Sequence, residues 1–169
     1  MIETVIERGG AWVRVVLAEP PGNLLSRALV GALRERIAAV RERSGLKWLT
    51  LESALRDFSF GASIPEHLPE EMPDVLPQAH ALLKDLLACP CPTAALVCGR
   101  CLGGGFELAL ACDDIIATHD ANLGLPEVQL AAFPPAAAAL LPVRVGASRA
   151  ARAMLTGEAH PAGYWEHAG

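Results

Sequence analysis

The sequence predicts an α/β fold in which short strands and helices alternate within one domain. Apolar residues make up 52% of the 169 residues and charged residues 20%, which is enough apolar material for one aliphatic core. Apolar runs rich in β-branched residues alternate with stretches of helical spacing, and this alternation is typical of βαβ units around a parallel sheet. We therefore expect residues 1–169 to form a single domain.

The first half of the chain predicts a hairpin, a helix and a further strand. Residues 5–17 alternate between apolar and polar side chains around two glycines, as the strands of a hairpin do. Ser26 can cap a helix over 27–43, whose apolar residues recur on one face. An apolar run at 46–51 predicts the next strand. The polar segment at 53–77 contains glycine and prolines, so we expect a loop with room for one helical turn.

The second half continues the alternation of helices and strands. Prolines at 90 and 92 limit one helix, and three consecutive glycines begin another. The expected elements are a helix at 78–88, a strand at 93–98, a helix at 106–112, a strand at 115–118, a loop or short strand at 123–128, and helices at 136–141 and 148–155.

Charge and targeting signals exclude several functional classes. The net charge is −5, whereas nucleic-acid and anionic-membrane partners favour a basic surface. The N-terminus carries two acids and lacks the apolar core of a signal peptide, and the longest apolar stretch is broken by prolines. The cysteine count is odd, at five, which favours reduced thiols. We expect a cytoplasmic protein with no nucleic-acid or membrane partner.

The glycine triplet Gly103–Gly105 is the strongest local feature. It follows a predicted buried strand and precedes a helix, whose first N–H groups and positive dipole end can hold an anion or a developing oxyanion. It matches neither the phosphate-binding loop of nucleotide-hydrolysing proteins nor the dinucleotide fingerprint. A tight strand-to-helix turn requires the same glycines, so both interpretations stay open.

Two glutamates and a second turn supply candidate chemistry. Glu107 lies in the first turn of the helix after the triplet, and Glu127 interrupts an apolar stretch. Each has a plain alternative, a helix-start acid for Glu107 and a solvated loop residue for Glu127. Placed together, two carboxylates suit activation of water and delivery of a proton. The turn at 58–63, with Gly61, is either a second source of N–H donors or a loop bend.

Metal and redox chemistry have weak support. Cys98 and Cys101 form a single C-x-x-C, and no second pair follows at the spacing of a zinc ribbon. His67 lies in a polar segment and is expected to be solvated, and His80 has no finger-like spacing to another ligand. We expect no metal site and interpret the cysteines as small buried side chains.

Taken together, these features resemble the crotonase (enoyl-CoA hydratase/isomerase) superfamily over nearly the whole chain. The matching segments are Pro-Gly-Asn-Leu-Leu at 21–25, Phe-Ser-Phe-Gly-Ala-Ser at 58–63, Cys-Leu-Gly-Gly-Gly-Phe-Glu-Leu-Ala-Leu-Ala-Cys-Asp at 101–113, Leu-Pro-Glu-Val at 125–128 and Leu-Thr-Gly-Glu at 155–158. The resemblance implies a crotonase-like spiral of repeated ββα units.

The resemblance also implies roles for particular residues. The backbone N–H groups of Ala62 and Gly104 would polarise a thioester carbonyl, and Glu107 and Glu127 would be the acid and base. Substrate-binding positions implied in the same way are Phe60, Gly61, Gly103, Gly105 and Phe133. The implied activity is that of a hydro-lyase without a cofactor, since coenzyme A is part of the substrate.

Two segments narrow the resemblance to one subfamily. Residues 61–69 and 133–137 resemble the dienoyl-CoA hydratases of anaerobic benzoyl-CoA degradation, which implies aromatic compound degradation and water addition to cyclohexa-1,5-diene-1-carbonyl-CoA. Where many hydratases are glycine-rich after the second glutamate, this chain has Pro134-Pro135 followed by alanines. The alternatives are another crotonase-type isomerase or ring hydrolase acting on acyl-CoA, or a truncated non-catalytic form that binds acyl-CoA.

The C-terminal end differs from the family pattern. Family members continue with further helices after the Leu-Thr-Gly-Glu segment, and residues 162–169 match only the start of such a helix. We therefore expect a core domain whose C-terminal helical region is largely absent. A homo-oligomer, either trimer or hexamer, is expected if those helices are not essential.

Overall fold

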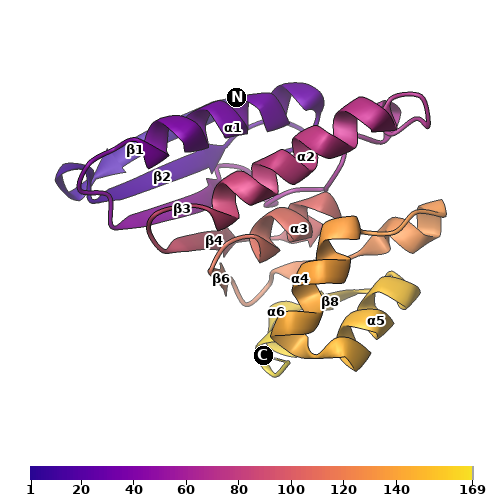
Figure 1. Cartoon of the computed structure of the whole chain (residues 1–169). Helices are drawn as coiled ribbons and strands as arrows, with labels where there is room; N and C mark the ends of the chain where they lie inside the picture. Colours follow the sequence, from indigo (N-terminus) through magenta and orange to yellow (C-terminus); the bar gives the residue numbers. More distant parts are fainter. Residues whose placement is uncertain (169) are drawn as a thin grey trace.

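A five-stranded sheet forms the larger part of the molecule in the computed structural model, which describes residues 1–168 (Figure 1). Its strand order is β1-β2-β3-β4-β6, and only the β1–β2 pair is antiparallel. Its strands are β1 (Ile2–Glu7), β2 (Trp12–Leu17), β3 (Trp48–Ser53), β4 (Thr93–Val97) and β6 (Asp114–Ala117). The predicted hairpin and the predicted parallel strands are therefore confirmed.

Two long helices cover one face of this sheet. Helix α1 (Arg27–Arg41) and helix α2 (Met72–Leu87) lie side by side over the strands and pack against each other (Figure 1). The side chain of Ser26 accepts a hydrogen bond from the Leu29 N–H at 3.2 Å, which confirms the predicted helix cap. Buried leucines, isoleucine and valines from both helices join those of the strands in one core.

A smaller sheet and the remaining helices form the other end of the molecule. Strands β5 (Arg100–Leu102), β7 (Asn122–Gly124) and β8 (Ala159–Pro161) make this second sheet. The helices are α3 (Gly104–Leu110), α4 (Pro135–Val145), α5 (Ala147–Thr156) and α6 (Ala162–Glu166), with 3-10 turns η1 (Arg8–Gly10), η2 (Ile64–Glu66) and η3 (Pro126–Leu130). Within residues 1–168, no helix has both the length and the apolar character needed to cross a membrane.

The prediction of a loop over residues 53–77 is partly wrong. Helix α2 begins at Met72, so its first turns fall where the prolines suggested irregular chain. Pro73 is tolerated in the first turn because the N–H it lacks has no partner there. Pro77 lies on the exposed side of the helix. Helix α6 confirms the helix start predicted at 162–169, and Gly169 lies outside the described residues.

A buried asparagine, Asn23, connects the turn before α1 with the segment at 53–58. Asn23 is fully buried and its Nδ2 donates to the Ser53 hydroxyl and to the Phe58 carbonyl, both at 2.8 Å. The Leu25 N–H donates to the Gly61 carbonyl at 2.8 Å. These bonds fix the segment at 58–62 against the start of α1, and that segment carries one side of the cavity described next.

Candidate active site

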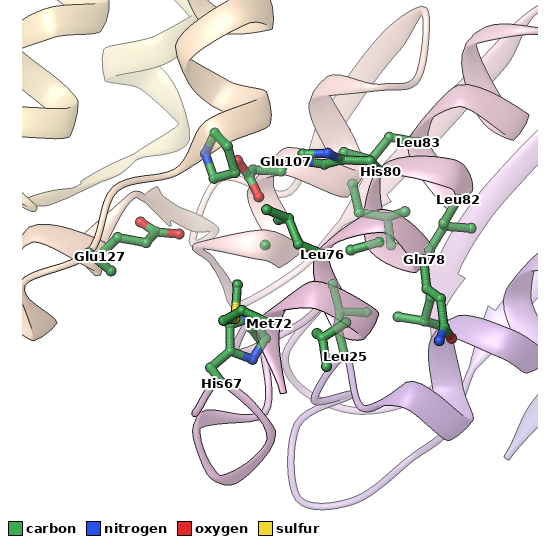
Figure 2. Close-up of a pocket in the computed structure, with 18 of the residues that line it drawn as sticks. Leu25, His67, Met72, Leu76, Gln78, His80, Leu82, Leu83, Glu107 and Glu127 are labelled. Carbon is green, nitrogen blue, oxygen red and sulfur yellow. The ribbon is translucent and has the colours of Figure 1, made fainter. Parts of the chain in front are cut away.

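A cavity of about 460 Å³ lies between the two long helices and the segment that runs from α3 to α4 (Figure 2). Side chains of α2 form one wall, and α3, η3 and the start of α4 form the opposite wall. The lining residues of α2 are mostly apolar, and they are Met72, Val75, Leu76, Gln78, Ala79, His80, Leu82 and Leu83. Such an apolar pocket with a few polar groups is typical of a binding site for a small molecule.

Two backbone N–H groups lie next to each other at the edge of the cavity. Gly104 is the first residue of α3, so its N–H has no partner within the helix. Within residues 1–168 the Ala62 N–H makes no backbone hydrogen bond either. Gly61 adopts φ +90°, and a Cβ added there would lie 2.6 Å from the Leu102 carbonyl oxygen and 3.2 Å from the Gly104 nitrogen. Only glycine permits this approach, which brings the two N–H groups together.

Glu107 is anchored by the N-terminus of α4. Its Oε1 accepts hydrogen bonds from the N–H groups of Ala136 at 2.8 Å and Ala137 at 2.9 Å. Pro135, the first residue of α4, has no N–H, so these amides are the first donors that the helix offers. Burial raises the pKa of the Glu107 carboxyl, and the two N–H groups oppose part of that rise.

The carboxyl of Glu127 lies in a less favourable electrostatic environment than the carboxyl of Glu107. Its Oε2 is buried without a hydrogen-bond partner among the described residues. Burial raises the pKa of Glu127 to about 7, and the negative charge of Glu107 adds to the rise. Gly103, at φ +53°, leaves room for this side chain, because a Cβ there would lie 2.7 Å from Glu127 Oε1. The two carboxyls therefore lie in different environments, one held by two amides and the other with a buried oxygen that lacks a partner.

Five of the nine predicted site residues line the cavity. They are Ala62, Gly104, Glu107, Glu127 and Phe133. Both glutamates point into the cavity from opposite ends of one wall (Figure 2). The structure thus brings together residues from segments that are far apart in the sequence.

The other four predicted residues are not among those that line the cavity. Phe60 stacks against Arg100, with 4.2 Å from the guanidinium carbon to the ring centroid. Gly61 and Gly103 allow the close backbone approaches described above, and a Cβ on Gly105 would lie 2.6 Å from the Ser59 Cβ. Direct substrate contact by these four residues stays a prediction.

Helix α2 and the loop before it contribute to the cavity, which the sequence did not indicate. His67 and His80 both line the cavity, although neither was assigned to it. The helical spacing of Val75, Ala79 and Leu83 was an available signal for an apolar wall, whereas nothing in the sequence indicated which groups would face it. Within the described part of the chain, no group of three or more His, Cys, Asp or Glu side chains is placed to hold a metal ion.

Comparisons with known proteins agree on one family. The sequence profile of the enoyl-CoA hydratase/isomerase family matches residues 7–169. Over 141 residues the chain is 38% identical to a cyclohexa-1,5-dienecarbonyl-CoA hydratase from Thauera aromatica, covering 83% of this chain and 55% of that protein. The chain therefore spans little more than half the length of this curated relative.

Solved structures show the same fold. An enoyl-CoA hydratase/isomerase family protein from Silicibacter pomeroyi superposes with a TM-score of 0.92 at 28% identity, covering all of this chain and 72% of that one. An enoyl-CoA hydratase from Bacillus anthracis superposes with a TM-score of 0.93 at 29% identity, covering 99% of this chain and 67% of that one. The predicted crotonase-like fold is confirmed.

Proposed function

The chain belongs to the enoyl-CoA hydratase/isomerase family, and from that premise we propose that it adds water to a conjugated acyl-CoA thioester. The observation that carries the proposal is the convergence, at one cavity, of two unpaired backbone N–H groups and two carboxyls in different environments. Addition of water to a conjugated thioester requires these two kinds of group, because charge develops on the carbonyl oxygen while two protons move.

In this proposal the N–H groups of Ala62 and Gly104 stabilise the transition state. As the nucleophile adds, negative charge moves through the conjugated system to the thioester oxygen, and two preorganised donors lower its energy. One such donor is worth about 3 kcal/mol in other acyl-transfer sites. The donors cost little reorganisation here because Gly61 and the start of α3 hold them in place.

The two glutamates take different parts in the addition. Glu107, whose Oε1 is held by two amides, keeps Oε2 free for the cavity and acts as the base that removes a proton from water. Glu127, with a pKa of about 7, is largely protonated in mildly acid solution and acts as the acid that protonates carbon. The hydroxyl ends on an electron-poor carbon and the Glu127 proton ends on another carbon. The proton taken up by Glu107 then leaves to solvent while Glu127 regains one, so that one molecule of water is added in total and both carboxyls return to their starting states. No redox change occurs, so the chemistry needs no cofactor beyond the coenzyme A of the substrate.

A cyclic dienoyl group is the acyl group we propose. The relative from Thauera aromatica, whose name specifies cyclohexa-1,5-dienecarbonyl-CoA, is 38% identical over most of this chain. The apolar wall of α2 faces the two carboxyls across the cavity and suits a hydrocarbon ring.

The proposal is tested by steady-state turnover of cyclohexa-1,5-diene-1-carbonyl-CoA by the wild type and three variants. Glu107→Gln and Glu127→Gln are each expected to lower kcat by about 10²–10⁴-fold, the usual contribution of general acid or base catalysis. Glu42→Gln, on an exposed glutamate at the end of α1, serves as the matched control and should retain wild-type turnover. Near-wild-type turnover in both active-site variants would exclude the assigned roles.

A further inference from the structure

His80 is the one histidine of α2, and it lies on the wall that faces Glu107. It is half-buried and lines the cavity together with the apolar side chains of the helix. Figure 2 shows its ring at the same end of the cavity as Glu107, while Glu127 and His67 lie further toward the other end. His80 and Gln78 are therefore the polar side chains on a wall of α2 that is otherwise apolar.

The position of His80 is not explained by any other contact. Within residues 1–168 its ring nitrogens make no hydrogen bond and no ion pair with the protein. His67 differs, since its Nδ1 lies 3.0 Å from the Ser63 carbonyl oxygen and its side chain is exposed. A half-buried imidazole without a partner inside a catalytic cavity is left free to act on groups in that cavity.

Few charges face Glu107 across the cavity. The titratable and charged groups of the lining are Glu127 from η3, His67 from the loop before α2, His80 from α2 and Arg27 from the start of α1. The guanidinium of Arg27 pairs with Glu71, so this cation is already compensated. The start of α4 offers Glu107 only the N–H groups of Ala136 and Ala137. The histidines are therefore the groups that can add uncompensated positive charge.

We infer that His80 is a positioning residue for the proposed catalytic pair, which in its protonated form holds Glu107 ionised across the cavity. Histidine changes its charge between about pH 5 and 8, the range in which a general base must stay ionised to work. Positive charge on His80 and on His67 opposes the rise in the Glu107 pKa that burial causes, and His80 has the larger effect. The catalytic meaning rests on the proposed function, whereas the coupling between His80 and Glu107 does not.

A direct titration tests the coupling without any substrate. The carboxyl carbons of the glutamates are labelled with carbon-13, the Glu107 signal is assigned by its loss in Glu107→Gln, and its chemical shift is followed with pH. In His80→Gln the Glu107 signal should titrate at a higher pH than in the wild type. His67→Gln should give a smaller change in the same direction. His119→Gln, on an exposed histidine outside the cavity, is the matched control and should give none.

Activity then shows whether the coupling serves catalysis. The kcat of His80→Gln should fall at about pH 6 and approach the wild-type value at pH 8, with KM nearly unchanged, because only the ionised fraction of Glu107 changes. A uniform loss of kcat at both pH values would instead indicate a merely structural role and would overturn the inference.

The outcomes separate this inference from the proposed function. If His80→Gln shifts the Glu107 titration but the wild type has no hydratase activity, the coupling is supported and the proposed function is wrong. An unchanged titration in an active enzyme overturns the coupling and leaves the function standing. If His80→Gln fails to fold, His80→Lys decides, since a permanent positive charge at that position must lower the pH at which the Glu107 signal titrates, and an unchanged Glu107 titration would overturn the inference.

Discussion

The replacement Glu127→Gln should stabilise the protein at neutral pH while it removes activity. In the folded state the Glu127 carboxyl has a pKa of about 7 against an ordinary value of 4.5. A raised folded-state pKa means that the protonated form stabilises the fold fully below about pH 4.5, and this stabilisation is lost as the pH rises through 7. Glutamine cannot ionise, so the variant avoids the loss. Oε2 is also buried without a partner, and a neutral amide costs less at that place than a charge.

The size of the effect follows from the two pKa values. The interval from 4.5 to about 7 corresponds to at most about 3 kcal/mol of unfolding free energy. Water in the open cavity screens part of this penalty, so we expect a gain of about 1–2 kcal/mol at pH 8. For a chain of this length the gain corresponds to a rise in Tm of about 2–8 °C.

Thermal unfolding of the wild type and Glu127→Gln at pH 4 and pH 8 measures the difference. The two proteins should have nearly equal Tm values at pH 4 and separate progressively up to pH 8. Glu42→Gln, on the surface, should show no such separation. Equal Tm values at pH 8, or a variant less stable than the wild type there, would refute the claim that Glu127 is an electrostatically unfavourable carboxylate.

Three further predictions concern the glycine turn, the buried asparagine and the cavity wall. Gly103→Ala should cost about 1–3 kcal/mol in denaturant unfolding and lower kcat, because φ is +53° and the added Cβ would meet Glu127 Oε1. Asn23→Ala should cost about 2–4 kcal/mol by the same measurement, since it removes the side-chain partner of the Glu19 N–H and of the Phe58 carbonyl. Leu76→Trp should raise KM for the cyclic dienoyl thioester by about tenfold, with a smaller effect on a short linear enoyl thioester, because the indole fills the cavity.

Each of these has a control variant or an outcome that would contradict it. Gly31→Ala, inside α1 with nothing within 4 Å of the added Cβ, should leave stability equal or slightly higher, which contrasts with Gly103→Ala. An Asn23→Ala protein as stable as the wild type would show that the two turns do not depend on that side chain. Equal KM changes for cyclic and linear substrates in Leu76→Trp would argue that α2 does not contact the acyl group.

Much of the fold could be predicted from local patterns. The hairpin at the N-terminus, the capped helix after Ser26 and the strand-glycine-helix unit at 93–110 each have a strong local signal, and the structure contains all three. The start of α2 at Met72 could not be predicted, because Pro73 and Pro77 are typical of loops. Pro73 is tolerated because it lies in the first turn, whereas Pro77 removes one hydrogen bond from the helix interior, a cost that the packing of α2 on the core offsets.

The site was predictable in part. Glu107 and Glu127 could be identified as candidates from their neighbours in the sequence. The amides of Ala136 and Ala137, which anchor Glu107, lie about thirty residues later, and no local pattern links them to it. The place of His80 likewise depends on how α2 packs over the core, which is a long-range property. Tertiary contacts, rather than local propensity, therefore determine the environment of both carboxyls.

The most direct test of the account is the mass of the product formed from cyclohexa-1,5-diene-1-carbonyl-CoA in water enriched in heavy oxygen. We predict an intact thioester that has gained one molecule of water and carries one heavy oxygen atom, with formation strongly reduced in Glu107→Gln and Glu127→Gln. A product of unchanged mass would indicate an isomerase. Release of free coenzyme A would indicate a hydrolase, and either result would contradict the central claim.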